Sequence, residues 1–66
     1  MRLAAWFKES GKTQEWLAGE VGCTQGRIAQ IAGGENPSLR LAAKIEFATG
    51  GAVAMRDLLV AEENAA

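Results

Sequence analysis

The sequence has no histidine and no tyrosine, and it contains a single cysteine, Cys23, and a single proline, Pro37. One thiol without any histidine excludes a disulfide within the chain and a Cys/His metal cluster. Histidine, the commonest general base, is missing, and no pair of carboxylates suggests a cleft. We therefore expect no catalytic activity, cofactor, metal or small-molecule substrate. The free thiol is compatible with a reducing cytoplasm.

Long apolar runs are missing as well, since none approaches the ~18 residues that a membrane-spanning helix needs. The N-terminal segment MRLAAWFKESGK has no apolar core of the signal-peptide kind. A chain of 66 residues, 48% of them hydrophobic, is long enough for one small globular domain. We assign residues 1–60 to that domain and predict that residues 61–66, AEENAA, form a disordered acidic tail.

An excess of positive charge, the usual mark of nucleic-acid binding, is also lacking. The chain has seven Lys and Arg against eight Asp and Glu, a net charge of −1. Because Glu62 and Glu63 lie in the tail, residues 1–60 hold seven basic against six acidic side chains, a net charge of +1. Any DNA binding would therefore depend on a few placed contacts rather than on a broad basic surface.

Glycines divide the chain into segments of helical length, and no strand-like alternation is longer than the fragment GAVAM. We expect an all-α fold of about five short helices. They begin near Arg2, Thr13, Thr24 and Ser38 and after Gly51. The predicted core consists of apolar residues spaced three or four apart: Leu3, Trp6, Phe7, Leu17, Ala18, Val21, Ile28, Ile31, Leu41, Ala42, Ile45 and Ala48.

Residues 13–31, TQEWLAGEVGCTQGRIAQI, have the pattern of a helix-turn-helix motif. Ala18 is small where two helices must cross closely, and Gly22 permits the backbone angle of a tight turn. Ile28 and Ile31 supply the shared core from the second helix of the motif. The segment NPSLRLAAKI then provides a further helix.

Over roughly residues 1–60, the chain resembles the lambdoid phage Cro and repressor family, the lambda repressor-like DNA-binding domains. The resemblance rests on Thr13-Gln14, Leu17-Ala18, Val21-Gly22, Ile28, Ile31 and NPSLRLAAKI. It implies that the helix from Thr24 enters the major groove and that a homodimer binds a palindromic operator of double-stranded DNA. The implied function is a Cro-like transcriptional repressor of a phage or prophage, in the cytoplasm.

A helical wheel of the segment after Thr24 directs Ile28 and Ile31 inward. The predicted base-contacting residues lie on the other side or on the flanks: Gln25, Gly26, Arg27, Ala29 and Gln30. Glutamine suits the N6 and N7 atoms of adenine, and arginine suits guanine or a phosphate. The alternative is that these are ordinary solvated helix residues.

Three residues are predicted to contact the phosphate backbone. The resemblance implies this role for Gln14, at the start of a helix. It suggests the same for Arg40, whose alternative is a solvated charge. Thr24, at the start of the next helix, is the third predicted phosphate contact. The alternative is that it only caps the helix, and both roles are compatible.

The sequence also departs from the family pattern. Gly26 stands where relatives often carry a base-reading side chain. Phe7 and Ala32 stand where many carry an Arg–Glu pair. The loop GGENPS has Glu35 and no lysine. We expect Trp16 to cover the core beside the first helix, the alternative being contact with a partner protein.

Two smaller features have simple interpretations. Cys23 is expected to fill the turn as a small hydrophobic residue. GKT, at residues 11–13, matches the end of a phosphate-binding loop, but Trp6 stands where that loop needs a glycine. We interpret GKT as a turn followed by a helix cap.

The predicted dimer interface is the segment after Gly51, with Val53, Met55, Leu58, Leu59 and Val60. The alternative is that these residues close the monomer core, and we expect the segment to do both. A rival function is a protein-interaction module on the same fold, such as an antitoxin-type or accessory regulator. The net negative charge, Gly26 and Trp16 favour that rival.

Overall fold

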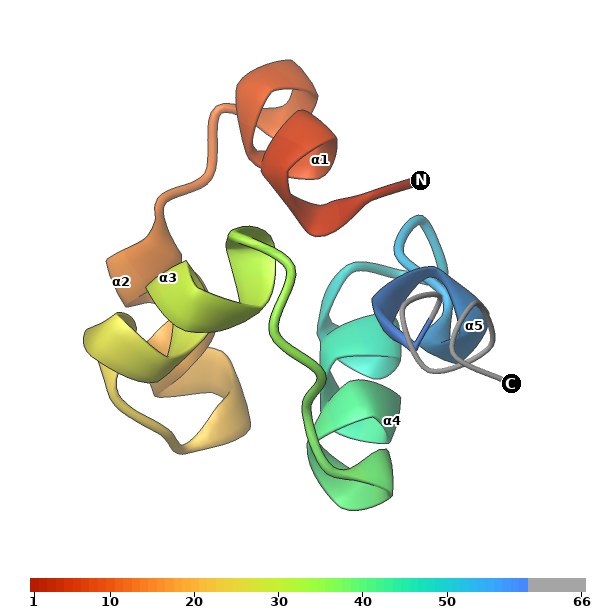
Figure 1. Ribbon diagram of the computed structural model, residues 1–66. Helices are drawn as coiled ribbons and strands as arrows, with labels where there is room; N and C mark the ends of the chain where they lie inside the picture. The colour runs from red at the N-terminus through yellow and green to blue at the C-terminus, as the bar shows by residue number, and fades with distance from the viewer. Residues whose placement is uncertain (60–66) are drawn as a thin grey trace.

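The computed structural model describes residues 1–59, and the regular secondary structure in that range is entirely helical (Figure 1). The helices are α1 (Leu3–Ser10), α2 (Gln14–Val21), α3 (Gln25–Ala32), α4 (Leu39–Ala48) and α5 (Met55–Leu58). The prediction of an all-α fold of five short helices is confirmed. The predicted tail at residues 61–66 and the predicted interface residue Val60 lie outside the described residues.

Short hydroxyl side chains begin three of the helices, as the sequence predicted. Thr13 Oγ1 accepts a hydrogen bond from the Trp16 N–H at 3.0 Å, and Thr24 Oγ1 accepts one from the Arg27 N–H at 3.1 Å. Ser38 Oγ accepts from the Leu41 N–H at 3.2 Å. Each bond satisfies one of the backbone donors that a helix leaves unpaired in its first turn.

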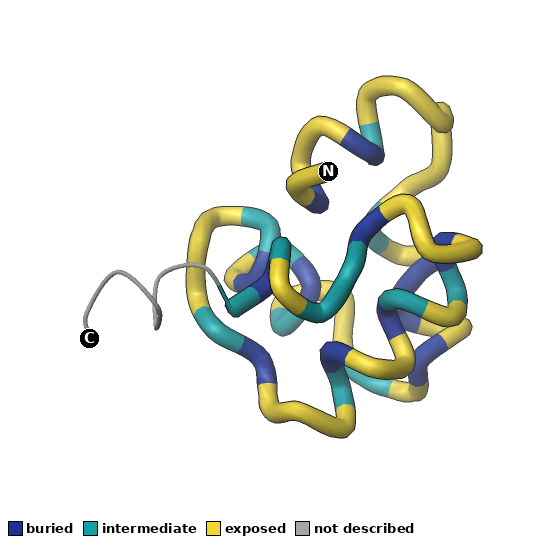
Figure 2. The backbone as a smooth tube through the Cα atoms, turned by 90° about the vertical axis from the view of Figure 1, so that its right-hand side faces the viewer, coloured by how far each residue is buried: buried dark blue, intermediate teal, exposed yellow. Residues whose placement is uncertain are grey.

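The core lies where the first four helices and the segment before α5 converge. Its largest fully buried side chains come from four different parts of the chain: Leu17, Ile28, Ile45 and Val53. Figure 2 shows buried positions recurring along the tube between exposed stretches, so each helix buries one face. Leu41 and Ala48, which were predicted to be buried, are half-buried at the edge of this core.

Aromatic side chains cover the core on the side of α1. Trp6 is buried, and its ring centroid lies 5.4 Å from that of Phe7 and 6.2 Å from that of Trp16. The Lys12 ammonium lies 4.8 Å from the centroid of the Trp16 ring, within the range of a cation–π interaction. Trp16 thus covers the core beside α1, as predicted.

The N-terminus is hydrogen-bonded to α5 and to the segment before it. The Met1 amino group donates to Asp57 Oδ2 at 2.7 Å and to the Ala52 carbonyl at 3.1 Å. Asp57 Oδ2 also accepts the Ala54 N–H at 3.0 Å, which is one of the two bonds of a capping box; alanine has no side-chain oxygen to make the other. The hydrogen bond from the amino group, followed by that from Ala54, lowers the pKa of Asp57.

Candidate nucleic-acid interface

The turn between α2 and α3 fixes how the two helices meet. Gly22 has a φ of 78°, a left-handed conformation that ends α2. The N–H groups of Gly22 and Cys23 both donate to the Ala18 carbonyl, at 2.9 and 3.0 Å. Cys23 is half-buried and packs against the core, as expected of a small hydrophobic residue. With Ile28 and Ile31 buried, α3 can present only its opposite face.

The outer face of α3 is small in its middle and polar at its sides. Gln25, Gly26 and Gln30 are exposed, and Ala29 is half-buried. A Cβ atom built at Gly26 would meet no heavy atom within 4 Å, so this part of the helix surface is open. Four of the five predicted base-contacting residues thus lie on or beside the outer face of α3.

A side-chain contact that the sequence reasoning missed joins the starts of α2 and α3. The Gln25 amide nitrogen, Nε2, donates to Gln14 Oε1 at 3.0 Å. The two glutamines each follow a capping threonine, and that shared position is the signal that could have suggested the pair. The bond leaves one N–H and the carbonyl oxygen of Gln25, and both N–H donors of Gln14, for other partners.

The Gln14–Gln25 contact also brings two positive helix ends to one place. The N-terminal end of a helix carries unpaired N–H groups and a partial positive charge, which favour a bound anion such as a phosphate. Gln14 is half-buried and Thr24 is exposed at this position. The capping role of Thr24 is observed, whereas its phosphate contact and that of Gln14 stay predictions.

Arg27 is engaged on the opposite flank of α3. Its Nη1 donates to Glu35 Oε1 at 3.1 Å, and its Nη2 donates to the Asn36 carbonyl at 3.4 Å. These bonds tie α3 to the loop that leads to α4 and pair Arg27 with Glu35. The base contact predicted for Arg27 stays a prediction, and making it would exchange these bonds for bonds to DNA.

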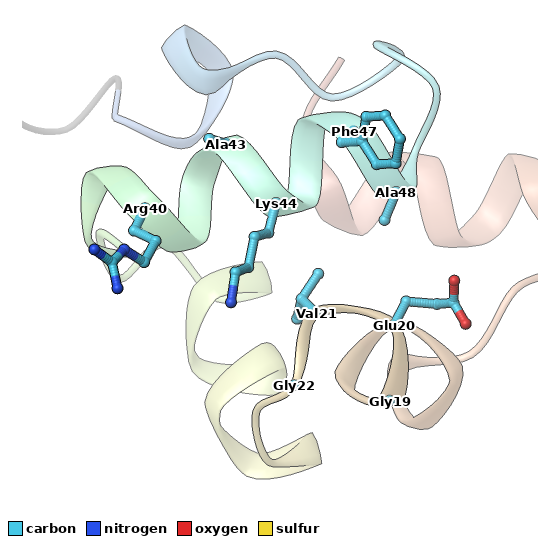
Figure 3. A pocket seen from close by; sticks show the side chains of 9 residues that line it. All are labelled: Gly19, Glu20, Val21, Gly22, Arg40, Ala43, Lys44, Phe47 and Ala48. Carbon is cyan, nitrogen blue, oxygen red and sulfur yellow. The ribbon is translucent and has the colours of Figure 1, made fainter.

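Arg40 is exposed in the first turn of α4, as the phosphate-contact prediction requires. Figure 3 shows Arg40 and Lys44 on the side of α4 that faces the end of α2. The two cations line an open groove whose other wall includes Gly19, Glu20 and Gly22. The sequence reasoning did not single out Lys44, although its spacing of four from Arg40 places both on one side of a helix.

The predicted dimer segment is largely part of the core. Val53 is fully buried and Leu58 is 7% exposed, so neither is available to a second chain. For these two residues the predicted interface is wrong, because their side chains close the monomer beneath α5. Met55 and Leu59 are half-buried, and Val60 lies outside the described residues.

The comparisons with known proteins give no further guide to this site. No family model matches the chain, and neither a curated protein nor a solved structure matches it. Within residues 1–59, no group of three His, Cys, Asp or Glu side chains is arranged to hold a metal ion. None of the helices in this range is both long enough and apolar enough to cross a membrane.

Proposed function

We propose that this protein is a sequence-specific DNA-binding regulator, in which α3 lies in the major groove and two copies occupy a palindromic operator. It would repress transcription by blocking polymerase, as a Cro-like protein of a phage or prophage does. The observation that carries the proposal is the Gln14–Gln25 hydrogen bond between the capped starts of α2 and α3. It places polar side chains and two positive helix ends beside the open outer face of α3.

The DNA contact proposed for each side chain follows from its chemistry. Gln25 and Gln30 are exposed amides on α3 and would read base edges, with adenine as the preferred partner. The small residues Gly26 and Ala29 would allow α3 to approach the bases closely. Gln14, Thr24 and Arg40 would bind phosphates and set the position of α3 in the groove.

Charge supports a modest electrostatic contribution to binding. Glu35, the acidic residue nearest to α3 in the loop, is paired with Arg27. Arg40 and Lys44 are exposed cations on α4. With so few phosphate contacts, the logarithm of affinity should fall with the logarithm of salt concentration at a shallow slope, about one unit for each phosphate neutralised.

A selection of random duplex DNA by the purified full chain, repeated at two salt concentrations, tests this function. We expect a palindromic consensus and weaker binding at the higher salt concentration. Gln25→Ala and Gln30→Ala should each weaken binding to that consensus by roughly 1–3 kcal/mol and leave binding to random DNA unchanged. Glu9→Ala, at an exposed position on α1, serves as the control. Equal losses on both DNAs would contradict base reading, and no enrichment at all would contradict the proposed function.

A protein-interaction module is the second candidate, of the antitoxin-type or accessory-regulator kind. The observation that favours it is the exposure of large apolar side chains on α4, where Phe47 is 89% exposed and Leu39 is 66% exposed. Large exposed apolar surfaces rimmed by polar residues are typical of protein contacts. Indifference to DNA in the selection, together with a defined complex that Phe47→Ala disrupts, would favour this candidate.

A further inference from the structure

Helix α4 has a second apolar face that the monomer does not use. Leu39, Ala43 and Phe47 are spaced four residues apart and are all exposed; we call them the α4 stripe. Residues at this spacing lie on one row along a helix, and the row from 39 to 47 is about 12 Å long. Of the three large apolar side chains that are exposed in residues 1–59, two belong to the α4 stripe.

Neither the core nor the proposed DNA contacts account for this stripe. Ala42 and Ile45 already place one face of α4 in the core, where both are fully buried. The Phe47 ring belongs to the last turn of α4, at the far end from Arg40 (Figure 3). A surface helix needs one apolar side, and a phenylalanine that is 89% exposed on another side gains almost nothing from burial in the monomer.

The α4 stripe is complementary to itself when a second copy of the helix runs antiparallel to it. A two-fold axis beside Ala43 places Phe47 of each copy next to Leu39 of the other. The two Ala43 methyl groups then meet at the crossing point, where their small size allows the helices to approach closely. An interface that uses the same patch on both partners is the arrangement of most two-fold dimers.

Charges beside the stripe favour the same antiparallel arrangement. In Figure 3, Glu20 lies below the Ala48 end of α4, and Arg40 lies toward the other end. When the second α4 runs antiparallel to the first, Glu20 of the second copy lies near Arg40 of the first copy. The two-fold axis gives a second, identical pair. A parallel pairing would leave Glu20 and the other copy's Arg40 at opposite ends of the interface. Opposite charges facing each other across an interface set its register and orientation.

We propose that the α4 stripe is the face on which a second copy of this chain docks, antiparallel and across a two-fold axis at Ala43. This interface takes the place of Val53 and Leu58, whose side chains are buried in the monomer, as the contact between protomers. A contact made by a single helix of ten residues is at the small end of protein interfaces. The free dimer is therefore weak and forms at high concentration. Binding of this dimer to a palindromic operator rests on the proposed function, but the docking of the two copies does not.

Sedimentation equilibrium of the full chain without DNA, at concentrations up to about 1 mM, tests the docking. We expect the wild-type chain to dimerise in this range. Ala43→Glu, which places two like charges at the axis, and Phe47→Glu should each raise the dimer Kd about tenfold or more. Ala5→Glu, at an exposed alanine on α1, is the matched control and should dimerise as the wild type does. Circular dichroism checks that every variant is folded.

Two further variants test the orientation. In a Cys23→Ala background, Ala43→Cys should give a covalent dimer on oxidation, because the two positions meet at the axis. Arg40→Glu should weaken the dimer that forms without DNA, and adding Glu20→Arg should restore that dimer. A wild-type chain that stays monomeric at all concentrations would overturn the proposal. So would folded Ala43→Glu and Phe47→Glu variants that dimerise as the wild type does, or a Phe47 surface that binds only a different protein.

The outcomes separate this proposal from the proposed function. A dimer sensitive to Ala43→Glu, in a protein that enriches no DNA sequence, would support the docking face and contradict the DNA-binding function. If the chain binds DNA sequence-specifically but its self-association is unchanged by Ala43→Glu and by Phe47→Glu, the docking face is contradicted and the DNA-binding function is not.

Discussion

At the scale of single residues, Gly19 and Gly22 illustrate two different uses of a missing side chain. Gly19 lies inside α2 with no left-handed φ, and a Cβ atom built there would meet no heavy atom within 4 Å. Gly22 has the same open surroundings but a φ of 78°. Glycine therefore only weakens the helix at position 19, whereas at position 22 it permits the turn that sets the direction of α3.

Replacing each glycine by alanine should change stability in opposite directions. Gly19→Ala should raise the free energy of unfolding by about 0.5–1 kcal/mol, because alanine has less backbone entropy to lose in a helix. Gly22→Ala should lower it by about 1–2 kcal/mol, because a Cβ atom is strained at positive φ. Urea unfolding with an unchanged m-value measures both shifts. Two shifts of the same sign would contradict this account.

At the scale of secondary-structure elements, the sequence predicted the helices well because their ends are encoded locally. Threonine or serine begins α2, α3 and α4, and Gly11 and Gly22 end α1 and α2 in the left-handed conformation. The N-terminal boundaries therefore followed from short-range rules. Short-range rules did not predict which aromatic residue of α1 is the more buried. Trp6 is buried and Phe7 is only half-buried, and this difference depends on packing against other parts of the chain.

The candidate site was only partly predictable for the same reason. The outer face of α3 follows from helical periodicity, which directs Ile28 and Ile31 inward. The Gln14–Gln25 bond depends on the angle between two helices, and the Arg27–Glu35 bond on the path of a loop. Residue spacing predicts neither the angle between two helices nor the path of a loop. The sequence therefore assigned these side chains to their helices and loop but could not predict which of them form hydrogen bonds with each other.

A prediction at this scale concerns the cap of α3. Thr24→Ala should lower the free energy of unfolding by about 1 kcal/mol, because the Arg27 N–H loses its acceptor. Thr24→Ser keeps the hydroxyl and should stay close to the wild type in stability. Thermal unfolding measures both variants, and for a domain of 60–100 residues about 1 kcal/mol corresponds to a Tm shift of about 4–8 °C. Equal stability of the alanine and serine variants would contradict the capping role.

At the scale of the whole molecule, the chain has one core and α4 takes part in it with only one of its two apolar faces. The core draws on α1 through α4, on Val53 and on Leu58 of α5, so the side chains of Val53 and Leu58 are not available to a partner. Periodicity alone did not distinguish these roles, since apolar residues at helical spacing occur on both sides of α4. Burial distinguishes them, with Ile45 fully buried and Phe47 exposed.

Two leucine-to-alanine substitutions test this division of the molecule into core and docking face. Leu17 is fully buried and Leu39 is 66% exposed, so the same chemical change is made in both environments. Leu17→Ala should cost about 2–5 kcal/mol, since it leaves a cavity among packed side chains. For a domain with a total stability of only a few kcal/mol, that loss should leave a measurable unfolded fraction at room temperature. Leu39→Ala should change the free energy of unfolding by less than about 0.5 kcal/mol at micromolar concentration, where the chain is a monomer.

Measuring the stability of Leu39→Ala at several protein concentrations completes the test, because the substitution should affect association of the chains but not folding of the monomer. At high concentration, association stabilises the folded state by mass action, so the wild-type midpoint of urea unfolding should rise with concentration. Leu39→Ala should reduce this rise because it removes the side chain that meets Phe47 of the second copy. A large loss of stability for Leu39→Ala at micromolar concentration would place Leu39 in the monomer core and leave α4 with a single apolar face. An undiminished rise with concentration would place the contact between copies elsewhere on the molecule.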